Sequence, residues 1–482
     1  MITLCIAASI ALGAGNCAKT DAFEEENSRA NLVVGVNVLL KRPIDGAMRV
    51  DLGRHGQVLD EMPEINAVAM RAAVSEIPLI RSEACVLEAS EDAPRYSAGS
   101  HLARIDDCAA GANLWNLDAI NVTDFGGGRT VGYDGDGVFV AVLDTGLPHN
   151  WREYFPADRI AVNLARTFGG GGGEKGTVSS QPETWEHDTG GHGTMVASIL
   201  LGYRYAGPQA LPTVFNGVAP KTTIIPVRAD KSRDGFAWTS VETSALLYLV
   251  NLKVSGALGN SRLVVNISWG GPDPDAIERA AIDYSIANGV IVVASAGNEG
   301  EVGMVYPAAY APVISVAAAA WKKQFAYDDP TQIEWIMRDV AENDPGEYLV
   351  TGFSGRELPG QQLDVTAPGA AVPVALTLDG RVDYAYFSGT SAAAPHVAGV
   401  AALMLQKNPS LTQAQIESIL RATAMPLPPG CNEVRVRFES HGRYPTWSDL
   451  RNLISFDATV CWGSNATGAG LVQANSALLA TP

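Results

Sequence analysis

From Gly137 to Gly300 the chain alternates between continuous apolar runs and segments whose apolar residues recur at helical spacing. The continuous runs are rich in Val and Ile, and they predict buried strands at 138–146, 223–230, 262–271 and 289–300. Helical spacing predicts helices at 241–254 and 275–289, the second ending at Gly289 as its C-terminal cap. Buried strands that alternate with helices predict an α/β fold with three layers, a parallel sheet covered by helices on both faces.

Upstream of this region the pattern predicts a small α+β module. The segments 31–43 and 78–94 have the pattern of strands, and 59–77 between them includes helical spacing. Residues 2–14 form an apolar run that is too short for a membrane helix but has the size of a secretory signal core. No basic residue precedes that run, so a buried N-terminal element is the alternative.

Composition narrows the class of protein. Hydrophobic residues make up 47% of the 482, enough for a large core, and no later apolar run is long enough to span a bilayer. The net charge of −18 argues against a nucleic-acid binder, because such proteins neutralise phosphates with Lys and Arg. Four cysteines follow the signal region, Cys85, Cys108, Cys431 and Cys461, and they fit either two disulfides in one of three pairings or four reduced thiols.

Three glycine-flanked segments carry reactive side chains. Asp144 ends the strand VFVAVLD, His192 lies in GGHGT, and Ser391 lies in FSGTSAAAPHVAG. Acyl transfer needs a hydroxyl nucleophile, a base to take its proton and an anion to orient the base, and these residues are of those three types. Asn298, in SAGNEG, has an amide that could donate to the developing oxyanion together with the Ser391 N–H.

These motifs and their order, Asp then His then Asn then Ser, resemble the signature regions of the subtilases, the subtilisin-like serine proteases. The resemblance implies that Asp144 orients the base, His192 is the base, Ser391 is the nucleophile and Asn298 is the oxyanion donor. It also implies a set of substrate-binding residues on two strands: Ser268, Trp269, Gly270, Ala294, Ser295, Ala296 and Gly297. Because these positions carry no acid, we expect apolar or aromatic side chains before the scissile bond.

The family resemblance also implies a domain organisation. We expect a signal peptide, an inhibitory prodomain and a subtilisin-like catalytic domain with three insertions. The bounds are 1–18 for the signal, 19–97 for the prodomain with its end within 90–108, 98–482 for the catalytic domain, and 169–186, 321–350 and 425–465 for the insertions. A Cys85–Cys108 disulfide would tether the prodomain after cleavage, and Cys431–Cys461 would lie within the catalytic domain.

The expected function is that of a secreted, self-processing, monomeric serine endopeptidase. Its partners would be protein or peptide substrates and its own prodomain, with no nucleic acid and no membrane beyond secretion. No cofactor or catalytic metal is expected; structural calcium is common in the family, but no site can be assigned here. The alternative is a catalytically silent binding protein on the same scaffold.

The remaining candidate residues have structural interpretations. His396 is expected to be a packing residue, His149 a loop residue, and His187 is not spaced to share a helix face with His192. Asp188 is expected to be a solvated loop carboxylate. The glycine run 169–173 lacks the ending of a phosphate-binding loop and predicts a flexible surface loop.

Overall fold

The computed structural model describes most of the chain but not all of it. The described residues are 30–97, 103–104, 114–124, 128–188, 190–205, 213–229, 236–325, 340, 344–378, 381–438 and 454–482. The expected signal peptide, Cys108 and the middle of the 321–350 insertion lie outside these ranges. Within them, no helix combines the length and the apolar character needed to cross a membrane.

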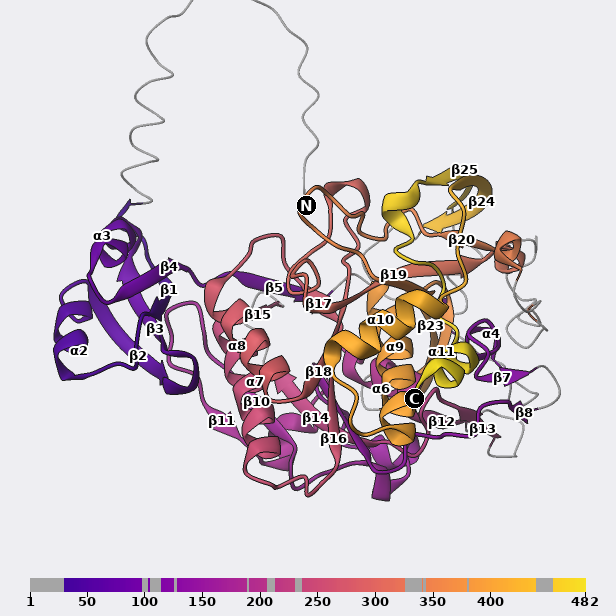
Figure 1. The fold of residues 1–482 in the computed structure, drawn as a ribbon, viewed down its shortest axis with the longest axis horizontal. Helices are drawn as coiled ribbons and strands as arrows, with labels where there is room; N and C mark the ends of the chain where they lie inside the picture. Colours follow the sequence, from indigo (N-terminus) through magenta and orange to yellow (C-terminus); the bar gives the residue numbers. More distant parts are fainter. Residues whose placement is uncertain are drawn as a thin grey trace, which may run out of the picture.

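A nine-stranded sheet forms the centre of the larger part of the molecule (Figure 1). Its order is β11-β10-β14-β9-β16-β18-β19-β20, and β21 also pairs with β19. The inner strands are parallel, while β11 and β20 pair antiparallel. The bounds are β9 Val138–Asp144, β10 Arg166–Phe168, β11 Val178–Ser179, β14 Thr223–Ala229, β16 Arg262–Ile267, β18 Val290–Ser295, β19 Ile314–Trp321, β20 Tyr348–Val350 and β21 Val365–Pro368.

Both faces of this sheet are buried, which explains its continuous apolar strands. On β9, Val140 and Val142 belong to one hydrophobic cluster, while Ala141 and Leu143 belong to another on the opposite face. The first cluster includes α6 (His192–Leu201) and α9 (Thr390–Lys407), and the second includes α7 (Thr239–Val254) and α8 (Ala276–Ala287). The predicted three-layer α/β fold is therefore confirmed.

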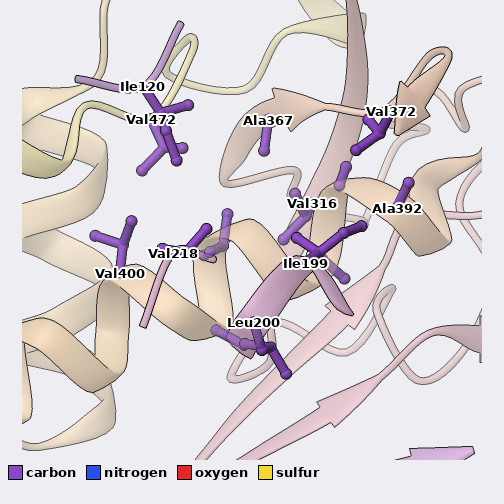
Figure 2. Close-up of a cluster of buried hydrophobic side chains, with 14 of the residues drawn as sticks. Ile120, Ile199, Leu200, Val218, Val316, Ala367, Val372, Ala392, Val400 and Val472 are labelled. Atoms are coloured by element: carbon purple, nitrogen blue, oxygen red, sulfur yellow. The ribbon is translucent and has the colours of Figure 1, made fainter. Parts of the chain in front are cut away.

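Part of the first cluster is shown in Figure 2, where Leu200 of α6, Val400 of α9 and Val316 of β19 are among the labelled side chains. The predicted helices at 241–254 and 275–289 correspond to α7 and α8. Gly289 follows α8 with a φ of 74°, as expected for a C-terminal cap. The candidate site lies at the ends of these helices and strands.

The N-terminal module is a four-stranded antiparallel sheet with the order β2-β3-β1-β4, and it has its own hydrophobic core. Its elements are β1 Val33–Leu40, α2 Gly46–Leu52, β2 Gly56–Met62, β3 Ala67–Ala73, α3 Ile77–Ser82 and β4 Val86–Glu91. Two expectations were wrong here. The segment 59–77 is mostly strand, because small apolar residues in AVAMRAA fit a period of two as well as a helical one. The segment 78–94 begins within a helix that starts at Ile77 and has Pro78 in its first turn.

The chain leaves this module through β5 (Pro94–Ser97), which enters the larger part of the molecule (Figure 1). β5 lies between β15 (Phe236–Trp238) and β17 (Trp269–Gly270) in an antiparallel three-stranded sheet. In this register Tyr96 is opposite both Phe236 and Gly270. The end of the N-terminal module is thus held by two strands that belong to the other part of the chain.

The remaining elements surround these two parts. A hairpin of β24 (Gly430–Phe438) and β25 (Ile454–Trp462) is closed by the Cys431–Cys461 disulfide, as expected. The Cys85–Cys108 pairing stays a prediction, because Cys108 is not among the described residues. Other bounds are α4 Trp115–Asp118, α5 Pro182–Trp185, α10 Gln413–Thr423, α11 Ala474–Ala480, β6 Ala103–Arg104, β7 Thr123–Asp124, β8 Gly128–Arg129, β12 Gly202–Tyr205, β13 Thr213–Asn216, β22 Val372–Leu378 and β23 Arg381–Phe387.

The glycine run 169–173 is packed between two partners: only Gly170 is exposed, and Gly173 is buried. A Cβ on Gly172 would lie 2.6 Å from the Trp238 ring, and one on Gly173 would lie 2.9 Å from the Gly35 nitrogen. Both glycines also have positive φ. The loop predicted to be a flexible surface loop is therefore packed against both β15 and the N-terminal module.

Candidate active site

The sheet and α6 bring Asp144 and His192 together. Asp144 is the last residue of β9 and is fully buried, while His192 is the first residue of α6. The Nδ1 atom of His192 lies 2.8 and 2.9 Å from the two carboxylate oxygens of Asp144, and the Thr145 N–H donates to that carboxylate at 2.7 Å. The opposite ring nitrogen, Nε2, is buried and has no hydrogen-bond partner among the described residues.

Asp188 supports the same helix start, and the expectation of a solvated carboxylate was wrong. The side chain is 5% exposed and accepts from the Thr145 hydroxyl at 2.7 Å and from the Thr194 N–H and hydroxyl at 2.9 and 2.6 Å. Burial raises the pKa of this carboxyl, against the lowering effect of the hydrogen bonds from Thr194 and Thr145. Asp188 therefore ties the turn after Asp144 to the first turn of the helix that begins at His192.

Ser391 lies in the first turn of α9, directly beside Ser268. The Ser391 hydroxyl donates to the Ser268 carbonyl at 2.8 Å, and the Ser268 hydroxyl donates to the Ser391 carbonyl at 3.0 Å. The second bond has a cause in the sequence: Pro395 has no N–H, so the Ser391 carbonyl lacks its usual helical partner four residues on. Pro395 thus explains why the Ser391 carbonyl accepts its hydrogen bond from the Ser268 hydroxyl.

Asn298 is held by the start of the same helix. Its Oδ1 accepts from the Thr390 N–H at 2.9 Å and from the Thr390 hydroxyl at 3.0 Å, while its Nδ2 is buried with no partner among the described residues. A Cβ on Gly389 would lie 3.2 Å from Asn298 Nδ2 and 3.6 Å from the Ser391 nitrogen. Glycine at 389, with a φ of 150°, therefore leaves space beside both predicted oxyanion donors.

The predicted substrate-binding residues occupy two places. Trp269 and Gly270 form β17, which pairs with β5, and Ser268 directly precedes it. The Trp269 indole points to the Glu242 carboxylate, to which it donates at 2.9 Å. The second set ends β18 and continues past it: Ala294, Ser295, Ala296 and Gly297. The Gly297 N–H donates to the Thr390 hydroxyl at 3.1 Å, so this set also meets the start of α9.

Two of the other histidines, His396 and His149, lie outside this arrangement. His396 is fully buried, with Nδ1 2.8 Å from the Ala392 carbonyl and Nε2 2.9 Å from the Asn116 amide, which confirms it as a packing residue. Burial lowers its pKa to about 4. His149 is exposed in a turn, as predicted. Across the described ranges, no group of three or more His, Cys, Asp or Glu side chains is placed to hold a metal ion.

Comparisons with known proteins agree with this architecture. The model of the subtilase family matches residues 135–456, and the chain therefore belongs to the subtilase family. Subtilisin E of Bacillus subtilis (strain 168) is 30% identical over 299 residues, which cover 61% of this chain and 62% of that protein. Subtilisin of Bacillus pumilus is also 30% identical over 299 residues, covering 61% of this chain and 86% of that protein.

A solved structure extends the likeness to the fold of nearly the whole chain. Fervidolysin from Fervidobacterium pennivorans, described as a keratinolytic enzyme related to subtilisin, superposes with a TM-score of 0.61 at 23% identity. The superposition covers 94% of this chain and 62% of fervidolysin. At this identity the likeness concerns the fold alone.

Proposed function

We propose that this chain is a serine endopeptidase that uses Ser391, His192 and Asp144 and processes itself. The observation that carries the proposal is the pair of buried atoms, His192 Nε2 and Asn298 Nδ2, that have no partner among the described residues. Folded proteins rarely leave buried polar groups unsatisfied, and these two are the groups that a reacting peptide would contact.

The proposed reaction follows from these positions. The Ser391 hydroxyl leaves the Ser268 carbonyl, gives its proton to His192 Nε2 and attacks the peptide carbonyl carbon. Asn298 Nδ2 and the Ser391 N–H hold the resulting oxyanion, while the buried Asp144 stabilises the imidazolium. His192 then protonates the leaving amine, and water, deprotonated by the same nitrogen, releases the acyl group from Ser391.

The position of β5 supports self-processing of the intact chain, because β5 lies along the site as a substrate strand would. Its main chain pairs with β15 on one side and with β17 on the other, and Ser97 is opposite Trp269. Ser268 directly precedes β17, and its carbonyl accepts a hydrogen bond from the Ser391 hydroxyl. On this basis we propose that the residue after Ser97 supplies the attacked carbonyl, which would give a mature N-terminus at Gly99. Residues 98–102 themselves lie outside the described ranges.

Secretion is part of the proposal. It is supported by the apolar run at 2–14 and by the Cys431–Cys461 disulfide, a bond that persists in oxidising compartments. The N-terminal module would then inhibit the enzyme for as long as β5 occupies the strand position that a substrate needs. A structural calcium ion also stays a proposal from the family, with no site assigned.

Covalent labelling tests the function directly. A fluorophosphonate should add to the purified, folded protein, and the adduct should be absent from Ser391→Ala while Ser410→Ala, which removes an exposed hydroxyl, still reacts. N-terminal sequencing should find Gly99 in the wild type and an uncut junction in Ser391→Ala. A folded wild-type protein that takes no label would refute the catalytic assignment and favour a silent binding protein.

A further inference from the structure

Arg95 is a fully buried cation at the centre of β5. Its Nε and Nη2 atoms donate to the two carboxylate oxygens of Glu278 at 2.7 and 2.8 Å, and both side chains are 0% exposed. A planar guanidinium and a carboxylate in this bidentate arrangement form one of the strongest charge-assisted contacts in proteins. The contact joins β5 to the first turn of α8, where Glu278 lies.

Two further carboxyl groups surround the same guanidinium. Burial, followed by the charge of Glu278, raises the pKa of Glu242 well above its ordinary value, and burial raises the pKa of Asp275 to about 6. One Glu242 oxygen accepts from the Trp269 indole, and the other is buried with no partner among the described residues. For Arg95, burial lowers the pKa but the charge and hydrogen bonds of Glu278 outweigh it, so the group stays protonated. We call Glu242, Asp275 and Glu278 the acidic site. It has three carboxyl groups around the single guanidinium of Arg95.

The acidic site belongs to the part of the chain that stays when β5 leaves. Glu242 lies on α7, Asp275 caps α8 and Glu278 lies on α8. A substrate strand that replaced β5 in the same register would direct its corresponding side chain to Glu278, because side chains of a strand alternate between faces. A neutral side chain there would leave a buried carboxylate without its cation, which is strongly unfavourable.

We propose that the acidic site is a specificity subsite of the enzyme, and that it selects substrates with arginine at the position of Arg95. That position is the fourth residue before the bond cleaved in the reaction proposed above, on which this inference rests. Lysine fits less well, because its ammonium is a point charge that cannot bond both Glu278 oxygens in the guanidinium geometry. The preference at this position is thus cationic, in addition to any apolar preference beside the scissile bond.

Quenched fluorescent peptides with the sequence of residues 91–104 test the preference on the processed wild-type enzyme. Their matched forms carry Arg95→Lys, Arg95→Gln or Arg95→Leu. We expect kcat/KM to be highest for arginine, intermediate for lysine and about 100-fold lower for glutamine and leucine. Equal values for the arginine, glutamine and leucine peptides would overturn the inference. Because this series uses the wild-type enzyme, it does not depend on the folding of any variant.

Enzyme variants then assign the preference to Glu278. Glu278→Gln should lower kcat/KM about 100-fold for the arginine peptide and raise it for the glutamine peptide, because the variant no longer leaves a buried carboxylate without its cation. Asp283→Asn is the matched control, since it removes an exposed carboxylate from the same helix and should change neither value. An unchanged arginine preference in a processed Glu278→Gln enzyme would also overturn the inference. A wild-type protein that takes the fluorophosphonate but shows no arginine preference refutes only the subsite, whereas one that takes no label and cleaves no peptide refutes the proposed function.

Discussion

Replacing Asn298 with alanine removes one proposed oxyanion donor and tests whether that donor acts only in the transition state. In the resting site, Asn298 Nδ2 is buried without a partner among the described residues, and the space beside it is kept open by Gly389. A hydrogen bond formed only to the developing negative charge should lower the activation barrier without tightening substrate binding. We therefore expect kcat to fall while KM stays near its wild-type value.

The expected size follows from the loss of one charge-assisted bond in a buried site. That bond contributes about 2.7 to 4 kcal/mol, which corresponds to a fall in kcat of about 100- to 1,000-fold; this scale was itself set on a subtilisin, a member of the same family. The variant also deprives Thr390 of the acceptor for its N–H and hydroxyl, so a lower Tm is expected.

Steady-state kinetics on the arginine peptide, with the active sites counted by fluorophosphonate titration, measures kcat per folded site. Asn298→Asp is the informative companion, because it keeps an oxygen for Thr390 and replaces the donor with a negative charge, and it should be at least as slow as the alanine variant. A raised KM with an unchanged kcat would refute the assignment, since it would mean that Asn298 binds substrate and transition state equally.

Three further predictions concern the groups around the site. The pKa of His396 is lowered from 6.5 to about 4, so the unfolded chain binds more protons between these values; stability should fall by about 3 kcal/mol as pH drops from 6.5 to 4. Urea unfolding at stepped pH should show this loss in the wild type, and an equal slope in His396→Gln would contradict it. Ser268→Ala should lower the free energy of unfolding by about 1 to 3 kcal/mol, because it leaves the Ser391 carbonyl without a donor. Adding Pro395→Ala restores a helical N–H and should recover part of this loss in the same urea assay. Asp188→Ala should lower both Tm and kcat, because the helix that carries the proposed general base, His192, loses its hydrogen bonds to the turn before it; a normal kcat with a lowered Tm would limit Asp188 to a structural role.

The four candidate catalytic residues could be predicted from the sequence because each stands at a boundary that the sequence marks. Asp144 ends a buried strand, Asn298 follows one, and His192 and Ser391 lie in the first turns of helices whose N-caps are glycines. In a parallel sheet the carboxyl ends of the strands, and the starts of the helices that follow them, lie at one edge. Residues predicted separately at these boundaries are therefore expected to lie close together. Their hydrogen-bond partners, by contrast, needed the structure.

The burial of Asp188 was not marked in the sequence. Nothing in its neighbourhood distinguishes a solvated loop carboxylate from a buried one that accepts three hydrogen bonds, because two of its donors come from Thr194 and one from Thr145 on a different turn. The Arg95–Glu278 contact is harder still, since its partners lie 183 positions apart. Charged residues are usually exposed, so only three-dimensional placement could show that both are buried.

The contact between the N-terminal module and the starts of α7 and α8 has a consequence for the timing of activity. Asp92 accepts from the Ser240 N–H and hydroxyl, and Asn37 donates to Asp275, the N-terminal cap of α8. While the chain is intact, these bonds form within one molecule, at an effective concentration on the order of millimolar. Cleavage after the β5 strand would turn the same contacts into an association between two molecules. With the secretion and inhibition proposed above, the module would inhibit strongly where the protein is concentrated and dissociate on dilution, so that dilution itself would set when activity appears.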